Sequence, residues 1–167
     1  MNSRISSAEF KAALSAVCTP VTVVTTVHDE RPHGTTVSSF CSLSLDPPMV
    51  LVSLDRSSEL LRLICQSGRY GVNVLAGHQS DIAQAFARKG NDKFAGIGHE
   101  IVAGLPRILG ASVWLQCRLA ELVDGGDHVI VLGAVERAGQ EPSEPLMYHD
   151  RTFRALAALP GETSIPA

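Results

Sequence analysis

Small hydroxyl side chains are concentrated in the segment Gly34–Pro48, which contains Thr35, Thr36, Ser38 and Ser39. Hydroxyls beside exposed backbone N–H groups can bind a phosphate or the polar edge of a heteroaromatic ring, and they lack the bulk that would push a planar ligand away. An edge strand accounts for the same residues differently, because Thr favours β geometry. The residue types alone leave both interpretations open.

Positive charge for a phosphate is available at Arg88 and Lys93, which follow a predicted helix. Arg binds anions through a two-pronged guanidinium group, and Lys acts as a point charge. The competing interpretation is a solvated surface patch that also includes Lys89 and Asp92, since charged side chains are mostly exposed.

His128 is the strongest single candidate for a chemical role. It follows Gly125, Gly126 and Asp127 at the start of a predicted strand, and imidazole gains or loses a proton near neutral pH. A lone His that enters a strand is more often structural. Asp127 can orient the imidazole, but adjacent strand residues point to opposite faces, so a backbone or capping role fits Asp127 equally well.

Metal and thiol chemistry have little support in the sequence. Cys18, Cys41, Cys65 and Cys117 form no Cys-x-x-Cys pair, and no His lies at zinc-finger spacing. We therefore predict no metal site and four reduced thiols that are mostly buried. No G-x-G-x-x-G segment follows a strand, so a Rossmann dinucleotide site is not indicated.

Length and composition bound the class of protein. The 167 residues fit one domain, with a predicted core over about 10–156 and a flexible tail at 160–167. Hydrophobic residues at 45% and charged residues at 19% are typical of a folded chain. A net charge of −3 without a dense Lys/Arg run argues against nucleic acid as a partner. No apolar stretch suits a signal peptide or a membrane span, so we expect a cytoplasmic protein that does not bind membranes.

The elements that must position these side chains are mostly strands. A capping box at Ser6–Glu9 predicts a first helix, and further helices are expected after Ser57 or Ser58 and after Ser80. Strands joined by polar turns or short helices are predicted over 21–27, 34–40, 49–54, 70–75, 112–123 and 128–138. The lack of regular βαβ alternation favours an antiparallel β-barrel decorated by helices.

Stretches spread over most of the chain together resemble the flavin reductase domain family, the reductase components of two-component aromatic monooxygenases. They are Gly34–Pro48 with the following MVLVSLDRSS, SGRYGVNVL from Ser67, FARKGNDKF from Phe86, and GDHVIVLGAV from Gly126. Each stretch is weak alone, but their occurrence in this order is specific. The segment PLMYHDRTFRAL also matches the family's closing strand pattern, so the resemblance runs from about residue 10 to residue 153.

The resemblance implies a mainly β fold with helices, a split β-barrel of the FMN-binding type. It also implies a homodimer with flavin held along the dimer interface, and it places His128 near the flavin face and the nicotinamide as the catalytic residue. The cofactor-binding residues that it implies are Thr35, Thr36, Val37, Ser38, Ser39, Ser53, Leu54, Asp55, Ser57, Ser58, Phe86, Arg88, Lys93 and Phe94.

The implied activity is hydride transfer from NADH or NADPH to N5 of FMN or FAD, with the reduced flavin passed to a separate monooxygenase. A protein for this reaction has to stack two planar rings at near-attack distance, and it needs no strong acid/base pair of its own. Two alternatives stay open: an oxidoreductase that retains FMN and reduces another acceptor, and a flavin-binding module without enzymatic activity.

Overall fold

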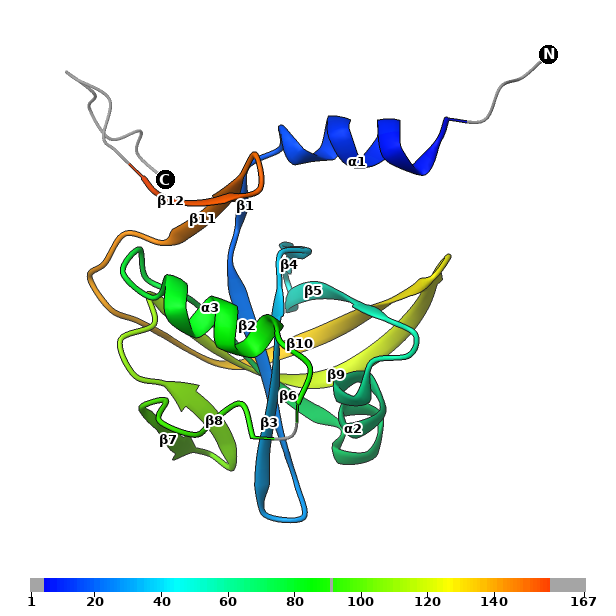
Figure 1. The fold of residues 1–167 in the computed structure, drawn as a ribbon. Helices are drawn as coiled ribbons and strands as arrows, with labels where there is room; N and C mark the ends of the chain where they lie inside the picture. The colour runs from blue at the N-terminus through cyan, green and yellow to red at the C-terminus, as the bar shows by residue number, and fades with distance from the viewer. Residues whose placement is uncertain (1–4, 91, 157–167) are drawn as a thin grey trace.

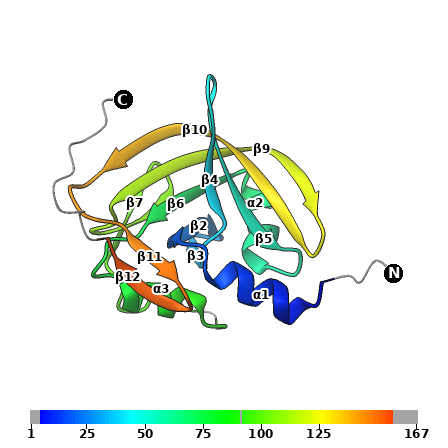
Figure 2. The ribbon, with the colours of Figure 1, turned by 90° about the horizontal axis from the view of Figure 1, so that it is seen from above.

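The computed structural model describes residues 5–90 and 92–156 of the chain. Its largest unit is a seven-stranded sheet of strand order β3-β2-β6-β9-β10-β5-β4, in which every neighbouring pair is antiparallel. The sheet curls on itself into a barrel (Figures 1 and 2). The predicted mainly β architecture with helices is therefore confirmed.

The strands of the barrel agree well with the predicted ones. They are β2 (Thr22–His28), β3 (Arg31–Val37), β4 (Phe40–Leu45), β5 (Pro48–Asp55), β6 (Arg69–Val74), β9 (Val113–Gly125) and β10 (His128–Gln140). The predicted strand over 34–40 was displaced by three residues, because β3 spans Arg31–Val37, and β4, which begins at Phe40, was not predicted as a separate strand.

Two smaller sheets flank the barrel. One contains β1 (Thr19–Pro20), β11 (Leu146–His149) and β12 (Thr152–Ala155), and the other is a hairpin of β7 (His99–Val102) and β8 (Leu105–Ile108). Sequence reasoning missed the β7–β8 hairpin. Buried Asn73 anchors it, since its side-chain amide accepts from the Ile108 N–H (2.8 Å) and lies 3.5 Å from the Pro106 carbonyl.

The helices are α1 (Ser7–Ser15), α2 (Glu59–Ser67) and α3 (Ser80–Ala87). The capping box at the start of α1 is confirmed. Ser58 is the N-cap of α2, but its side chain makes no capping hydrogen bond, and α3 begins at Ser80 with Gln79 as its N-cap. In the described part of the chain, no helix is long and apolar enough to span a bilayer. The predicted tail at 160–167 lies outside the described residues.

Apolar side chains form one cluster on each side of β2. Val24 belongs to the cluster inside the barrel, which α2 closes with Leu61 and Ile64. Val23 belongs to the other cluster, where α3 covers the outer face with Phe86. This alternation follows from the two-residue period of a strand, and it positions α3 against the edge strand β3.

The barrel has a seam between its two edge strands. β3 and β4 lie at opposite edges of the sheet but are consecutive in the chain, so Ser38 and Ser39 cross from one edge to the other. β4 pairs with β5 only as far as Val52, and the rest of β5, residues 53–55, has no β4 partner. The ladder is open there, as the predicted split barrel requires.

The prediction of mostly buried thiols was wrong. All four cysteines are free, but only Cys117 is buried, while Cys18, Cys41 and Cys65 are exposed. The reason is position: Cys41 lies on an edge strand, and Cys65 follows the buried Leu63 and Ile64 on the outer face of α2. Burial raises the pKa of the Cys117 thiol to about 12, so it is protonated and unreactive at neutral pH.

Candidate functional site

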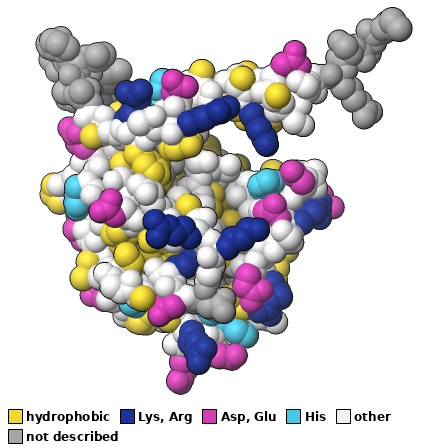
Figure 3. Space-filling view, in the orientation of Figure 1, with side chains coloured by type: hydrophobic (Ala, Val, Ile, Leu, Met, Phe, Trp, Pro, Cys, Tyr) yellow, Lys and Arg dark blue, Asp and Glu magenta, His cyan; other side chains and the backbone are white. Residues whose placement is uncertain are grey.

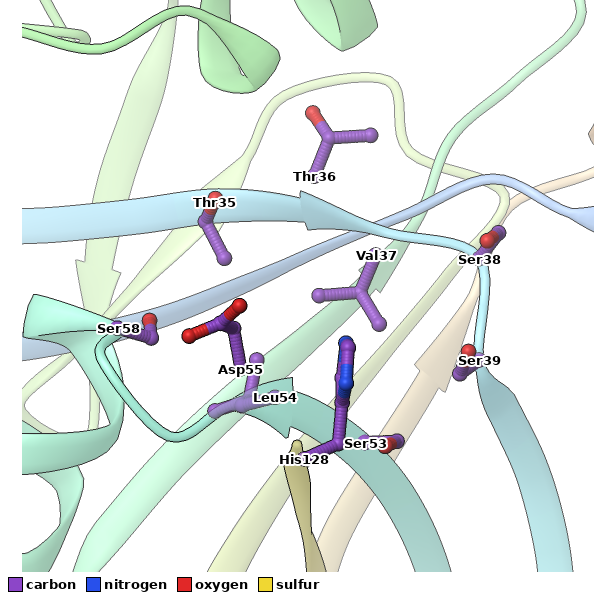
Figure 4. Close-up of a pocket in the computed structure, with 10 residues that line it drawn as sticks. All are labelled: Thr35, Thr36, Val37, Ser38, Ser39, Ser53, Leu54, Asp55, Ser58 and His128. Carbon is purple, nitrogen blue, oxygen red and sulfur yellow. The ribbon is translucent and has the colours of Figure 1, made fainter. Parts of the chain in front are cut away.

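A pocket of about 240 Å³ occupies the seam of the barrel. It lies between the end of β3, the Ser38–Ser39 crossing, the end of β5 that extends beyond β4, and the start of β10 (Figure 4). The residues that line it are Thr35, Thr36, Val37, Ser38, Ser39, Ser53, Leu54, Asp55, Ser58 and His128. The face that carries the seam is visibly hollowed in Figure 3.

The β3 wall offers backbone groups and apolar surface more than free hydroxyls. The Thr36 hydroxyl donates to the Ala83 carbonyl of α3 (2.7 Å), and its side chain points away from His128 (Figure 4). Because β3 is an edge strand, its outward backbone groups remain open to a ligand. Val37 and Leu54 are nearly fully buried and supply an apolar floor.

The β5 wall ends in a fixed carboxylate. Asp55 accepts hydrogen bonds from the backbone N–H (2.7 Å) and the hydroxyl (2.6 Å) of Ser57. These bonds lower the pKa of the Asp55 carboxyl, so it is ionised at neutral pH. The negative charge of Asp55 repels a phosphate from this end of the pocket, whereas the carboxylate can accept a hydrogen bond from a ring N–H group.

His128 reaches into the pocket from the first position of β10. It is the cross-strand partner of Asp55, and its imidazole points toward Val37 (Figure 4). Nδ1 lies 2.8 Å from the Asp127 carboxylate. A carboxylate only accepts, so Nδ1 carries a proton and donates to Asp127, which leaves Nε2 as the ring nitrogen available to the pocket. The hydrogen bond from His128 lowers the pKa of the Asp127 carboxyl.

Every residue that lines the pocket was a sequence candidate, although the ligand role of each remains a prediction. Other candidates lie elsewhere. Phe86 and Phe94 are core residues in edge-to-face contact, with ring centroids 4.8 Å apart, so their side chains do not reach the pocket. The Ser57 hydroxyl donates to Asp55, and Ser57 is exposed and does not line the pocket.

The two candidate cations differ from each other. The Lys93 ammonium donates to the Phe86 carbonyl at the end of α3 (2.9 Å), and its partial burial lowers its pKa. Arg88 is the exposed C-cap residue of α3. Lys and Arg side chains gather over the end of α3 beside the hollow in Figure 3. One of the three Lys93 donors thus caps the end of α3, and Arg88 has no side-chain hydrogen bond or ion pair within the described residues.

The residues of the pocket fit the ring of a flavin. An isoalloxazine ring needs an apolar surface, hydrogen-bond partners along one edge and no bulky side chain in its plane, and Val37, Leu54 and the open β3 edge meet these needs. The volume is below the roughly 300–1,000 Å³ of a pocket that encloses a whole ligand. The seam can therefore hold a flat ring with one face open.

The fold and the pocket define a split-barrel protein whose seam pocket has a shape and lining that suit a planar heteroaromatic ligand. The chain matches the family described as "Flavin reductase like domain" over residues 14–157. It is 40% identical over 160 residues to the flavin-dependent monooxygenase reductase subunit HsaB of Mycobacterium tuberculosis, a match that covers 93% of this chain and 86% of HsaB. The chain belongs to the flavin reductase like domain family.

Solved structures agree with this assignment. Flavin reductase PheA2 in its native state superposes with a TM-score of 0.85 at 32% identity, over 92% of this chain and 100% of PheA2. The NADH:FAD oxidoreductase SgcE6 of Streptomyces globisporus C-1027, in complex with NAD and FAD fragments, gives a TM-score of 0.88 at 31% identity, over 93% and 94% of the two chains. The split-barrel fold of the family is thus confirmed.

Proposed function

We propose that this protein is an NADH-dependent flavin reductase that reduces free FMN or FAD and supplies the product to a separate monooxygenase. The observation that carries the proposal is the seam pocket, which joins an apolar floor, an open strand edge and an inward-pointing His128. Relatives support it: besides HsaB, a flavin reductase (NADH) of Kitasatospora aureofaciens is 38% identical over 86% of this chain.

When bound, flavin and nicotinamide supply the hydride acceptor and donor of the reaction. The chain contributes geometry and electrostatics. Val37 and Leu54 support one face of the ring, and the N–H groups of the Ser38–Ser39 crossing favour negative charge on its edge. Nε2 of His128 accepts a hydrogen bond from an amide donor such as a carboxamide, which orients the second ring over the first.

The proposal is tested by measuring oxidation of NADH and of NADPH at 340 nm with FMN, FAD and riboflavin in turn. We expect turnover with NADH and free, exchangeable flavin. A protein that binds FMN but oxidises neither nucleotide is a flavin-binding module, and one that retains FMN through dialysis and reduces a different acceptor is a prosthetic-group enzyme. Either result would overturn the proposal.

We expect His128→Ala to raise the KM for NADH roughly tenfold, the effect of one lost orienting hydrogen bond, while the affinity for flavin is retained. His78→Ala, at an exposed site that does not line the pocket, is the matched control. Steady-state kinetics and flavin titration separate the two effects. Unchanged kinetics in His128→Ala would remove His128 from the site.

We expect Arg88→Ala to weaken binding of FMN roughly tenfold and to leave riboflavin binding unchanged, because riboflavin has no phosphate for the guanidinium to meet. Lys93→Met should instead lower the free energy of unfolding by about 1 kcal/mol, through loss of the hydrogen bond to Phe86. Calorimetric titration with both flavins and thermal unfolding measure these effects. Equal losses of FMN and riboflavin affinity in Arg88→Ala would place the phosphate elsewhere.

The chain also fits the homodimer that the family resemblance implies. Helix α1 lies apart from the barrel (Figure 1), and none of its residues is buried. Phe10 and Leu14 of α1 and Val17 after it are each about half exposed, at 51%, 52% and 52%. Burying this apolar surface against a second copy would stabilise a dimer. Light scattering on the purified protein tests it, and a monomer at micromolar concentration would contradict it.

A further inference from the structure

Arg56 connects the turn after β5 to the turn between β9 and β10. Its backbone N–H donates to the Asp127 carbonyl (3.1 Å), its Nε donates to the Gly126 carbonyl (2.7 Å), and its terminal nitrogen meets the Asp124 carboxylate (2.8 Å). Three donors of one residue thus reach two residues of the turn and Asp124 near the end of β9.

This turn carries Asp127, whose carboxylate is the hydrogen-bond partner of the His128 imidazole. Asp127 is 92% exposed, and the only side-chain hydrogen bond found for its carboxylate in the described chain is the one from His128. Little besides the backbone of the turn therefore fixes where that carboxylate lies. Gly126, at φ 75°, occupies the left-handed region that gives the turn its shape, and the Arg56 guanidinium binds its carbonyl.

The pairing of β5 with β10 stops short of the turn between β9 and β10. The register ends at Asp55 and His128, so the turn lies beyond the last cross-strand pair. Arg56 is the next residue of the chain after Asp55, and it extends the connection by its backbone and its side chain. A guanidinium suits this task because its rigid, planar donors can serve two acceptors at once.

We propose that Arg56 is a positioning residue: by holding the β9–β10 turn, it keeps the Asp127 carboxylate on Nδ1 of His128 and Nε2 directed into the seam pocket. The inference deepens the proposed function and rests on it for its effect on NADH. Arg56 itself touches neither ring, since it does not line the pocket. It acts through the turn and the imidazole.

A merely stabilising role for Arg56 predicts something different. Exposed ion pairs contribute little to stability, and the Arg56 and Asp124 side chains are 46% and 84% exposed. Arg62 provides a matched control, because it is 51% exposed and pairs with Glu59 on the surface of α2. If only surface charge mattered, substitutions at Arg56 and Arg62 would have equal effects.

The test compares Arg56→Gln, Arg56→Lys and Arg62→Gln with the parent protein in two measurements. Nitrogen-15 NMR of the imidazole reports which ring nitrogen of neutral His128 carries the proton, with the signal assigned from His128→Gln. Steady-state kinetics report KM for NADH and kcat separately. The NMR readout needs no turnover, so it remains informative if the protein does not oxidise NADH and the proposed function fails.

We expect the parent and Arg62→Gln to show the Nδ1–H tautomer, and Arg56→Gln to show a mixture with Nε2–H. KM for NADH should rise roughly 2–10-fold in Arg56→Gln with kcat and flavin affinity nearly unchanged, as for the loss of one orienting hydrogen bond. KM for NADH in Arg56→Lys should lie between those of the parent and Arg56→Gln, because Lys keeps the positive charge but lacks the planar guanidinium group. A tautomer and KM in Arg56→Gln equal to those of Arg62→Gln would overturn the inference. So would a parallel loss of thermal stability, kcat and flavin affinity.

Discussion

Ser53→Trp is expected to weaken flavin binding at least about 100-fold, which corresponds to about 2.7 kcal/mol. Ser53 lies on the end of β5 that extends beyond its pairing with β4, and its backbone N–H donates to the Ser39 carbonyl across the seam (3.0 Å). Its side chain is only half-buried and lies beside His128 at the pocket (Figure 4). An indole there fills the pocket and leaves the apolar core inside the barrel intact.

Two further variants make this result interpretable. Thr152→Trp adds the same bulk to an exposed position of β12, outside the barrel sheet, and should keep full affinity. Ser53→Ala preserves the space and should change affinity only a fewfold. Isothermal titration with FMN measures all three, and thermal unfolding confirms that each is folded. If Ser53→Trp binds FMN as tightly as the parent, the ring does not bind in the seam.

The composition of the pocket was predictable because its residues come from three short, contiguous segments. The polar residues of these segments are evident in the sequence: Thr35–Ser39, Ser53–Ser58 and His128. The family resemblance assigned all three segments to one ligand. Apolar and β-rich runs bounded by turn residues also located β5, β6, β9 and β10 to within a few residues. These features depend on local sequence, which a reader of the chain sees directly.

What could not be predicted depends on which surfaces meet in the folded chain. Phe86, Arg88 and Lys93 belong to the same motif, FARKGNDKF. Because α3 packs against β3, the Phe86 ring lies in the core and the Lys93 ammonium donates to the carbonyl at the end of α3. Gly34 permits this docking, since a Cβ there would lie 2.8 Å from the Phe86 ring. Spacing along the chain contains no signal for such a contact.

Arg56 illustrates the same limit at the site itself. In the sequence it is one Arg in the run DRSS, with no pattern that separates it from Arg62 six positions later. Its partners, Gly126 and Asp124, lie about seventy residues away, at separations of 70 and 68. A resemblance to a family points to residues that line the ligand, whereas a residue that positions them becomes visible only from hydrogen bonds between distant turns.

The largest loss of stability is expected from Gly133→Ala, at about 3 kcal/mol, because the barrel interior leaves no room for a methyl group. A Cβ at Gly133 would overlap the Tyr70 hydroxyl and lie 2.7 Å from Tyr70 Cζ and 3.0 Å from Cys117 Cβ. Tyr70 is completely buried, so its ring cannot swing away. Gly133 also follows a shift in the β9–β10 register, where the backbone has little freedom to retreat.

Chemical denaturation of three variants distinguishes this steric conflict from a general intolerance of alanine in β10. Gly139→Ala, in the same strand with no atom within 4 Å of its Cβ, should change the free energy of unfolding by less than about 0.5 kcal/mol. Combining Gly133→Ala with Tyr70→Phe removes the nearest atom and should recover part of the loss, because the two sites then couple through the shared space. Additive losses in the double variant would show that the hydroxyl is not the obstacle. In that case the obstacle to the methyl group would be the backbone of β10, the strand that begins with His128.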